Sequence, residues 1–423
     1  METPPNRTPA PWSTSPRLGA GLVTGAADDD PSGIATYSQA GAQFGVHLLW
    51  TVILTYPLMA AIQAISARIG RVTGRGLADN LAATLPRPVV MLLVLLLFVA
   101  NTINIGADLA AMGAAAELLV GRWQAGFAIV FALLSLLLQL FVPYHRYVVV
   151  LKWLTLALFA YVGVVFTVEI DWLEVARGLL QPELELKRET ILIIVAVFGT
   201  TISPYLFFWQ AAQEVEDAAI GPLPNSLADG AEEGPGELRR IGYDTLIGMG
   251  FSNLIAFFIM LTTAVTLNRA GITDITTSAE AAEALRPIAG PFAFLLFSAG
   301  IIGTGLLAIP VLAGSAAYAI AEVRGWPAGL ERAPRQAIAF YAVIAAGMLL
   351  GLLIVFLPID PIRALVWSAV INGIIAVPLM AAILLVGASR RLLGPWVVPR
   401  WQLALGWLAT GLMALAALAL LFL

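Results

Sequence analysis

Three consecutive carboxylates stand inside a long apolar segment, where Asp28, Asp29 and Asp30 are followed directly by Pro31 and, two residues later, by Gly33. Proline lacks an N–H and disfavours helix at the residue before it, and glycine tolerates unusual backbone angles, so we expect a helix to break here. A carboxylate beside freed backbone carbonyls makes an oxygen-rich site for a hard cation. The alternative is that the acids lie at the end of the segment and cap a helix N-terminus, and it stays open above all for Asp28 and Asp29.

A second apolar segment, residues 190 to 216, is interrupted in the same way. The interruption consists of Gly199, Thr200, Thr201, Ser203 and Pro204. It comes about five hydrophobic segments after the first, which suggests an internal repeat. Two discontinuous helices at matching positions of two halves indicate an inverted-repeat secondary transporter, with its substrate site where the breaks meet.

A third group of polar residues lies between the two breaks. Asn101, Asn104 and Asp108 have the spacing of one helix face. They face the same cavity, or they form hydrogen bonds between helices, and the sequence does not distinguish these readings. Asn253 and Asn372 are single polar residues in apolar segments, and we interpret them as structural contacts.

The elements that position these residues must be membrane helices. Of the 423 residues, 60% are hydrophobic and only 12% are charged, whereas soluble domains carry roughly a quarter charged residues. Apolar runs of about 20 residues predict about eleven spans. Backbone groups must be paired internally in hydrocarbon, so each run is a helix and the fold class is an all-α polytopic membrane protein. The expected spans are 18–44, 46–67, 88–119, 125–143, 147–170, 190–216, 241–268, 290–320, 336–358, 361–388 and 400–423.

Composition also excludes several kinds of chemistry. The chain has no Cys, two His and a net charge of -4, which disfavours thiolate sites, imidazole chemistry and nucleic-acid binding. We expect no cofactor. An intramembrane enzyme that uses Asp28 to Asp30 is a weaker alternative, because no second, comparably placed acidic motif accompanies them. A sodium-coupled organic-solute symporter is also weaker, because the acidic triplet would repel a substrate carboxylate.

The positive-inside bias predicts the orientation. With a cytoplasmic N-terminus, 16 of the 23 Lys and Arg residues lie on the inner side, so the C-terminus lies outside. We expect a multi-pass protein of the plasma membrane that works as a monomer. The expected organisation is a disordered cytoplasmic tail over 1–17 and one transmembrane domain over 18–423. Within that domain, repeat one covers about 18–170, repeat two about 190–388, and an additional helix about 400–423.

The run DDDPSGIATYSQAGAQFGVHLLW, followed by GTTISPYLFFWQ, resembles the natural-resistance-associated macrophage protein (Nramp) family of divalent metal transporters. The resemblance implies a LeuT-like inverted repeat of 5+5 helices plus an extra C-terminal helix, with helices 1 and 6 broken. Metal-transporting members have Asp-Pro-Gly-Asn at the first break and Ala-x-x-Met-Pro-His at the second. Their ion is held by Asp and Asn side chains, an Ala carbonyl and a Met thioether.

This chain departs from that pattern. Asp30 matches the Asp, but Gly33 stands for the Asn, Thr200 for the Ala, Ser203 for the Met and Tyr205 for the His. A thioether selects transition metals, whereas hydroxyls, carbonyls and water suit Mg²⁺. We also expect the loss of the Asn side chain at Gly33 to enlarge the site. The departures resemble the Nramp-related magnesium transporter branch, and imply a metal site of Asp30, Gly33, Thr200 and Ser203.

The resemblance also bears on coupling. The family's proton pathway uses the His after the second break together with an Asp and a Glu on the third span; here only Asp108 remains, because Tyr205 and Ala111 replace the other two. Tyrosine does not relay protons at neutral pH as imidazole does. The prediction is import of Mg²⁺, and also of Mn²⁺, by alternating access without protons; proton-coupled Mn²⁺ or Fe²⁺ transport is the alternative. Residues given secondary or vestibule roles are Asp28, Asp29, Asn101, Asn104, Asp108, Tyr205 and Gln210.

Overall fold

The computed structural model describes residues 19–142, 146, 151, 153, 155–182, 186–220, 225–228, 232 and 234–423. The expected N-terminal tail, 1–17, lies outside these residues. Within them the regular elements are helices, and no strand occurs. The helices of the first half are α1 (Ala20–Asp28), α2 (Pro31–Phe44), α3 (Trp50–Thr73), α4 (Leu77–Ala82), α5 (Arg87–Val120), α6 (Gln124–Phe141), α8 (Phe159–Val165) and α9 (Trp172–Leu180). Those of the second half are α10 (Arg188–Thr201), α11 (Pro204–Ile220), α12 (Gly234–Thr263), α13 (Ser278–Glu283), α14 (Arg286–Ala289), α15 (Ala293–Arg324), α16 (Ile338–Ile354), α17 (Pro361–Gly387), α18 (Arg390–Leu393) and α19 (Arg400–Phe422).

The membrane spans follow the order expected from the sequence. Among the described residues, eight helical segments are long and apolar enough to cross a membrane. The other three expected spans correspond to shorter helices: the broken pair α1 and α2, α16 with 17 residues, and the fifth span, of which the apolar stretch Thr155–Val165 is described. The fold is therefore that of a multi-pass membrane protein. The limits proposed for the two repeats stay predictions.

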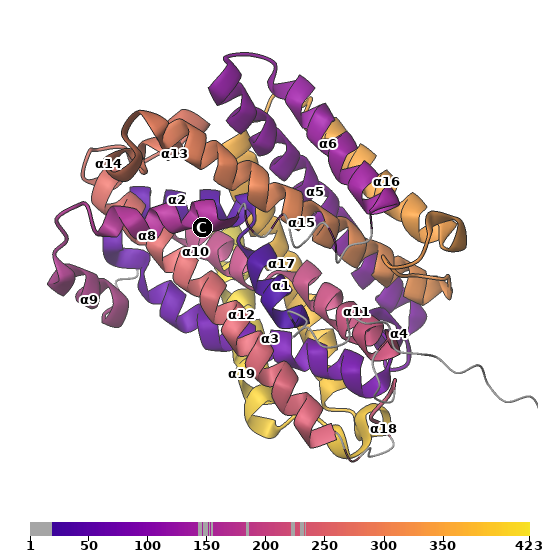
Figure 1. The fold of residues 1–423 in the computed structure, drawn as a ribbon. Coiled ribbons are helices and arrows are strands. Elements are labelled where there is room, and N and C mark those ends of the chain that lie inside the picture. Colours follow the sequence, from indigo (N-terminus) through magenta and orange to yellow (C-terminus); the bar gives the residue numbers. More distant parts are fainter. Residues whose placement is uncertain are drawn as a thin grey trace, which may run out of the picture.

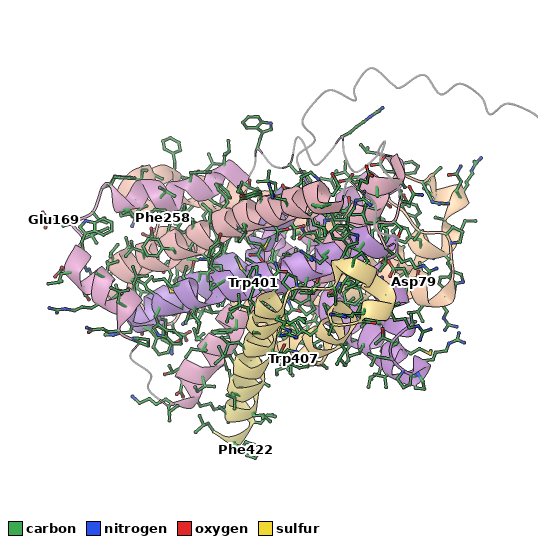
Figure 2. All side chains as sticks on the ribbon, turned by 90° about the horizontal axis from the view of Figure 1, so that it is seen from below. Asp79, Glu169, Phe258, Trp401, Trp407 and Phe422 are labelled. Atoms are coloured by element: carbon green, nitrogen blue, oxygen red, sulfur yellow. The ribbon has the colours of Figure 1, made fainter. Side chains whose placement is uncertain are left out.

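The long helices lie side by side and form one bundle. They run from the end that carries α13 and α14 toward the end that carries α4 and α18 (Figure 1). The outer surface is apolar: Trp407 and Phe422 of α19 project outward from it (Figure 2), with 47% and 86% of their side chains exposed. Such aromatic and aliphatic side chains suit contact with lipid rather than water.

Both expected helix breaks are confirmed. The first helical segment stops at Asp28 and resumes at Pro31, while the second stops at Thr201 and resumes at Pro204. Each proline is the first residue of its new helix, where its missing N–H costs no hydrogen bond and its fixed φ suits the helix. The Asp30 backbone is extended (φ -71°, ψ 171°), as the proline after it requires.

The α1 half-helix is held by α12. Its N-cap, Gly19, offers no side chain, and Asp244 of α12 instead accepts a hydrogen bond from the Gly21 backbone N–H at 2.7 Å. Lower down, a Cβ added at Gly25 would collide with the carbonyl group of Gly248. The two backbones are therefore in direct contact, which only glycine at these positions permits.

Replacing Gly25 by Ala tests this contact. The added methyl group has no room, so we expect a loss of about 1–3 kcal/mol of stability, as for other overpacked positions. The measurement is the thermal unfolding midpoint of the purified protein in detergent. Gly242→Ala on α12 is the matched control, because an added Cβ there meets nothing within 4 Å. Equal midpoints for the two variants would contradict the proposed packing.

Candidate metal site

The two helix breaks meet in the middle of the bundle. The Ser32 hydroxyl oxygen lies 3.4 Å from the Thr200 hydroxyl oxygen, which joins the first break to the second. A Cβ added at Gly33 would lie 3.2 Å from the same Thr200 oxygen. Asp30, Gly33 and Thr200, which the sequence placed in one site, are thus brought together by helices that are 168 residues apart in the chain.

Asp30 is the centre of this site and is 1% exposed. Its Oδ1 accepts hydrogen bonds from the Gly33 N–H and the Ser32 hydroxyl, each at 2.7 Å. Its Oδ2 accepts from the Asn104 amide at 2.9 Å. All three donors are neutral, so the negative charge of Asp30 is held in place and is not cancelled.

Asn104 is itself oriented by a residue of α17. The Asn372 amide donates to Asn104 Oδ1 at 3.3 Å, so the Asn104 amide nitrogen faces Asp30. Sequence reasoning assigned Asn372 to a structural contact, whereas it stands one hydrogen bond behind the site. Its own Oδ1 is buried and has no hydrogen-bond partner among the described residues. Only the tertiary contact between α5 and α17 reveals this arrangement.

Asp28 and Asp29 are buried, which excludes the reading that they cap a helix at the membrane surface. Both face the Ser252 hydroxyl of α12, at 2.6 Å from Asp28 Oδ2 and 3.0 Å from Asp29 Oδ1. That hydroxyl has a single proton, so it satisfies only one of the two carboxylates at a time. Ser252 carried no signal in the sequence, since a lone serine in an apolar helix is common.

The fourth acid of the site region, Asp108, is completely buried, and both of its carboxylate oxygens lack a hydrogen-bond partner. None of the ion pairs among the described residues involves Asp28, Asp29, Asp30 or Asp108. Nor do three or more His, Cys, Asp and Glu side chains in the described part of the chain converge to hold a metal ion. The region therefore carries four buried carboxyl groups without a basic partner among the described residues, and a bound cation would stabilise their ionised form.

Two of the residues singled out from the sequence, Asn101 and Gln210, form hydrogen bonds away from Asp30. Asn101 points to α15, where it donates to the Leu312 carbonyl and the Ser315 hydroxyl. The Gln210 amide donates to Thr245 of α12. Gln210 is fully buried and lines neither of the two described pockets, and its expected vestibule role stays a prediction.

Ser203 and Tyr205 lie at the second break but do not contact Asp30 through a hydrogen bond. The Ser203 hydroxyl donates to the Gly199 and Thr200 carbonyls at the end of α10, and so caps that helix. The Tyr205 hydroxyl donates to the Ala27 carbonyl of α1. Ser203 still offers its oxygen lone pairs, whereas Tyr205 connects α11 to α1.

The missing side chain at Gly33 does not leave a void, contrary to the expectation of an enlarged site. The space of a Cβ there is bounded by Thr200 Oγ1, the Asp28 carbonyl oxygen and the Tyr37 ring, at 3.2, 3.4 and 3.4 Å. The tyrosine on the next turn of α2 closes the room that a longer side chain at position 33 would occupy. A Cβ at this position would be slightly too close to Thr200 Oγ1 and in ordinary contact with the other two groups.

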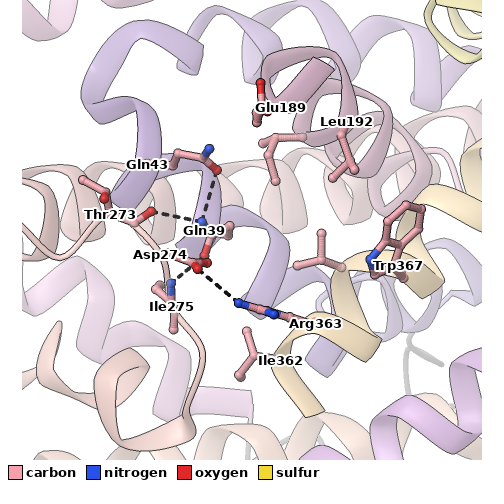
Figure 3. Close-up of a pocket in the computed structure, with 12 residues that line it drawn as sticks. Gln39, Gln43, Glu189, Leu192, Thr273, Asp274, Ile275, Ile362, Arg363 and Trp367 are labelled. Carbon is pink, nitrogen blue, oxygen red and sulfur yellow. Dashed lines mark hydrogen bonds and ion pairs between the residues drawn. The ribbon is translucent and has the colours of Figure 1, made fainter. Parts of the chain in front are cut away.

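A pocket of about 470 Å³ lies at the end of the bundle that carries α13 and α14 (Figure 3). It is lined by residues of α2, α10, α17 and the segment before α13, among them Gln39, Ile193 and Trp367. Gln39 fixes that segment, because it donates to the Thr273 carbonyl and accepts from the Ile275 N–H. Asp274 of the segment pairs with Arg363 of α17 at 3.3 Å. The pocket stops short of Asp30 and its partners.

Comparisons with known proteins agree on the family. The divalent metal cation transporter MntH of Klebsiella pneumoniae is 27% identical over 406 residues, which cover 92% of this chain and 90% of that protein. A crystal structure of the manganese transporter of Eremococcus coleocola superposes with a TM-score of 0.72 at 16% identity, covering 97% of this chain and 88% of that one.

More distant transporters share the fold. Mhp1, a nucleobase-cation-symport-1 family transporter, reaches a TM-score of 0.58 at 15% identity in its closed conformation, over 96% of this chain and 91% of its own. These likenesses confirm the LeuT-like inverted-repeat fold with its first and sixth helices broken. The family model described as natural resistance-associated macrophage protein-like matches residues 21–423. The chain therefore belongs to the Nramp family.

Proposed function

We propose that this chain imports Mg²⁺, and also Mn²⁺, by alternating access at the junction of its two broken helices. The observation that carries the proposal is the environment of Asp30: one buried carboxylate at the junction of the two breaks, held by neutral donors only. The names of the relatives, a divalent metal cation transporter and a manganese transporter, support a divalent cation as the substrate.

The preference for Mg²⁺ rests on the chemistry of the neighbouring groups. The hydroxyls of Ser32 and Thr200 lie near Asp30 and offer oxygen as a ligand atom, whereas the Asn104 amide turns its N–H to Asp30. Mg²⁺ dehydrates reluctantly and is usually held by one or two carboxylates while it keeps several waters. A site with one buried carboxylate, hydroxyl neighbours and no sulfur fits a partly hydrated Mg²⁺ better than a soft transition metal.

The driving force in this proposal is the membrane potential. An inside-negative potential provides about 4.6 kcal/mol per 100 mV for a divalent ion, twice the value for one elementary charge. Tyr205 stands where the family's proton-relaying His stands, and its hydroxyl is occupied by the Ala27 carbonyl. Uptake of the ion therefore requires no proton.

Proton-coupled transport of Mn²⁺ or Fe²⁺ is the second candidate, and one observation favours it. Asp108 is fully buried and has no hydrogen-bond partner among the described residues. A buried carboxylate without a partner is costly, and a proton stabilises it as well as a metal cation does. The two candidates thus differ in what Asp108 carries during transport.

For the orientation, we propose a cytoplasmic N-terminus, on the positive-inside bias of the loops. The 470 Å³ pocket then opens to the outside, because it lies beyond α2, at the end opposite the start of α1. With this orientation, α1 and α11 lie between the breaks and the cytoplasmic side. The chain works as a monomer in this proposal.

Replacing Asp30 by Asn tests the ligand. The variant keeps the shape and loses the charge, so Mg²⁺ flux into proteoliposomes under an inside-negative potential should fall at least tenfold, the size of effect expected for a group that holds a metal. Asp171→Asn is the matched control, because Asp171 caps the exposed helix α9 far from the site. If Asp30→Asn transports at half the normal rate or better, Asp30 is not the ligand.

The replacement of Ser203 by Met tests the origin of ion preference. A thioether at this position should raise the ratio of Mn²⁺ to Mg²⁺ flux by about tenfold, because sulfur favours transition metals. Leucine has a volume similar to that of methionine but no sulfur, so Ser203→Leu should leave the ratio unchanged. The readout is flux of the two ions in competition. Equal effects of Met and Leu would mean that size rather than sulfur determines the preference.

Internal pH recorded during ion entry separates the two candidate functions. We expect Mg²⁺ to enter without acidification of the vesicle interior, and Asp108→Asn to leave the proton movement at zero. Manganese entry with acidification that disappears in Asp108→Asn would replace the first proposal by the second. Vesicles without protein supply the baseline for proton leak.

A further inference from the structure

Two buried tyrosines each connect one half-helix to the other broken helix. Tyr37 of α2 lies 2.8 Å from the Thr201 hydroxyl of α10. Thr201 donates its own proton to the Val197 carbonyl at 2.7 Å, so Tyr37 must be the donor in this pair. Tyr205 of α11 donates to the Ala27 carbonyl of α1 at 3.2 Å. Both tyrosine side chains are buried.

The Tyr37 contact lies between the outer pocket and Asp30. On α2, the order along the helix is Gly33 at the site, Tyr37 one turn later, and then Gln39 at the pocket. On α10, Ile193 lines the pocket and Thr201 is eight residues nearer the break, about 12 Å along a helix. The same two helices therefore form a wall of the pocket and, closer to the site, are joined by the Tyr37–Thr201 hydrogen bond.

The Tyr205 contact lies on the opposite side of the site. Tyr205 is in the first turn of α11, and Ala27 is in the last turn of α1. These two half-helices leave the breaks in the direction away from the pocket. The Tyr205–Ala27 hydrogen bond therefore joins the two chain segments through which an ion would leave Asp30 toward the other face.

The two contacts join corresponding pairs of half-helices, at different positions along them: Tyr37 is six residues after Pro31, and Tyr205 is one residue after Pro204. In an inverted repeat α1 corresponds to α10, and α2 corresponds to α11. Tyr37 connects α2, which follows the first break, to α10, which precedes the second. Tyr205 connects α11, which follows the second break, to α1, which precedes the first. Because the repeats have opposite orientations in the membrane, the corresponding pairs of half-helices lie on opposite sides of the site. The chain thus has one tyrosine contact on each side of Asp30.

We propose that Tyr37–Thr201 is the outer gate of the cation site, that Tyr205–Ala27 is its inner gate, and that they open in alternation. The inference rests on the function proposed above, because a gate has meaning only if an ion passes Asp30. Each gate consists of one neutral hydrogen bond and a buried ring. Such a bond contributes about 1 kcal/mol, which corresponds to about a fivefold change in an equilibrium, so one gate opens without disruption of the bundle.

The experiment measures access to the site from each side. Because the chain has no cysteine, a Ser32→Cys substitution introduces the only thiol, directly beside Asp30. A membrane-impermeant methanethiosulfonate reagent is applied to spheroplasts for outer access and to inside-out vesicles for inner access. We expect Tyr37→Phe to raise the outer labelling rate about fivefold without raising the inner rate, and Tyr205→Phe to do the opposite.

Tyr341→Phe is the control, because it removes another buried tyrosine hydroxyl that donates to a backbone carbonyl, that of Arg332, away from both breaks. It should change neither rate. The gates are refuted if Tyr37→Phe and Tyr205→Phe leave both rates unchanged, or if either raises both rates as general loosening would. Protection of the thiol by Mg²⁺ is scored separately: its absence counts against the proposed function, whatever the two tyrosine variants do.

Discussion

The structure depends on one constraint: polar backbone groups and charged side chains at membrane depth must be shielded from lipid. A helix satisfies its own polar groups in lipid, and a break is tolerated only where protein or water replaces the lost hydrogen bonds. Here the polar groups at the two breaks are paired partly within each break and partly with each other. Ser32 connects the first break to Thr200 at the second, Asp30 caps α2 through the Gly33 N–H, and Ser203 caps the end of α10. A site that joins two distant segments is the direct result of this pairing, and it lies in the middle of the bundle because no lipid-facing position would tolerate it.

The same burial concentrates negative charge where the protein offers no basic partner among its described residues. Asp28 and Asp29 share one serine hydroxyl, Asp30 has three neutral donors, and Asp108 has none. Neutral donors fix the direction of a carboxylate without cancelling its charge, which is the condition for attracting a cation to a defined position. The arrangement spends folding stability on a polar centre, and close helix contacts elsewhere, such as that of Gly25 with Gly248, bind the half-helices to the rest of the bundle.

Access to the centre depends on how the half-helices meet on either side of it. In this structure, the 470 Å³ pocket ends before Asp30, and α2 and α10 are joined between the pocket and the site by the Tyr37–Thr201 hydrogen bond. On the other side of the site, α11 and α1 are joined by the Tyr205–Ala27 hydrogen bond. The four half-helices therefore enclose Asp30, with one hydrogen bond on each side of it. This arrangement is compatible with the alternating access proposed above. The nearby segment before α13, fixed by Gln39 and by the Asp274–Arg363 pair, forms part of the pocket wall on the outer side.

The sequence by itself determined the class of the protein, the order of its spans and the position of both helix breaks, because apolar length and the effects of Pro31 and Pro204 on the backbone are local properties. It also pointed to Asp30, since an acid directly before a proline in an apolar run has few structural reasons to be there, and it placed Thr200 among the polar residues of the second break. Only the tertiary structure decided which polar side chains face the site. Asn101 and Asn104 lie on one face of α5, yet Asn101 turns to α15 and Asn104 turns to Asp30. Ser252, Asn372 and Tyr37 acquire their places from helices far away in the chain, and a single polar residue in an apolar helix has no local feature that reveals which neighbour it will meet.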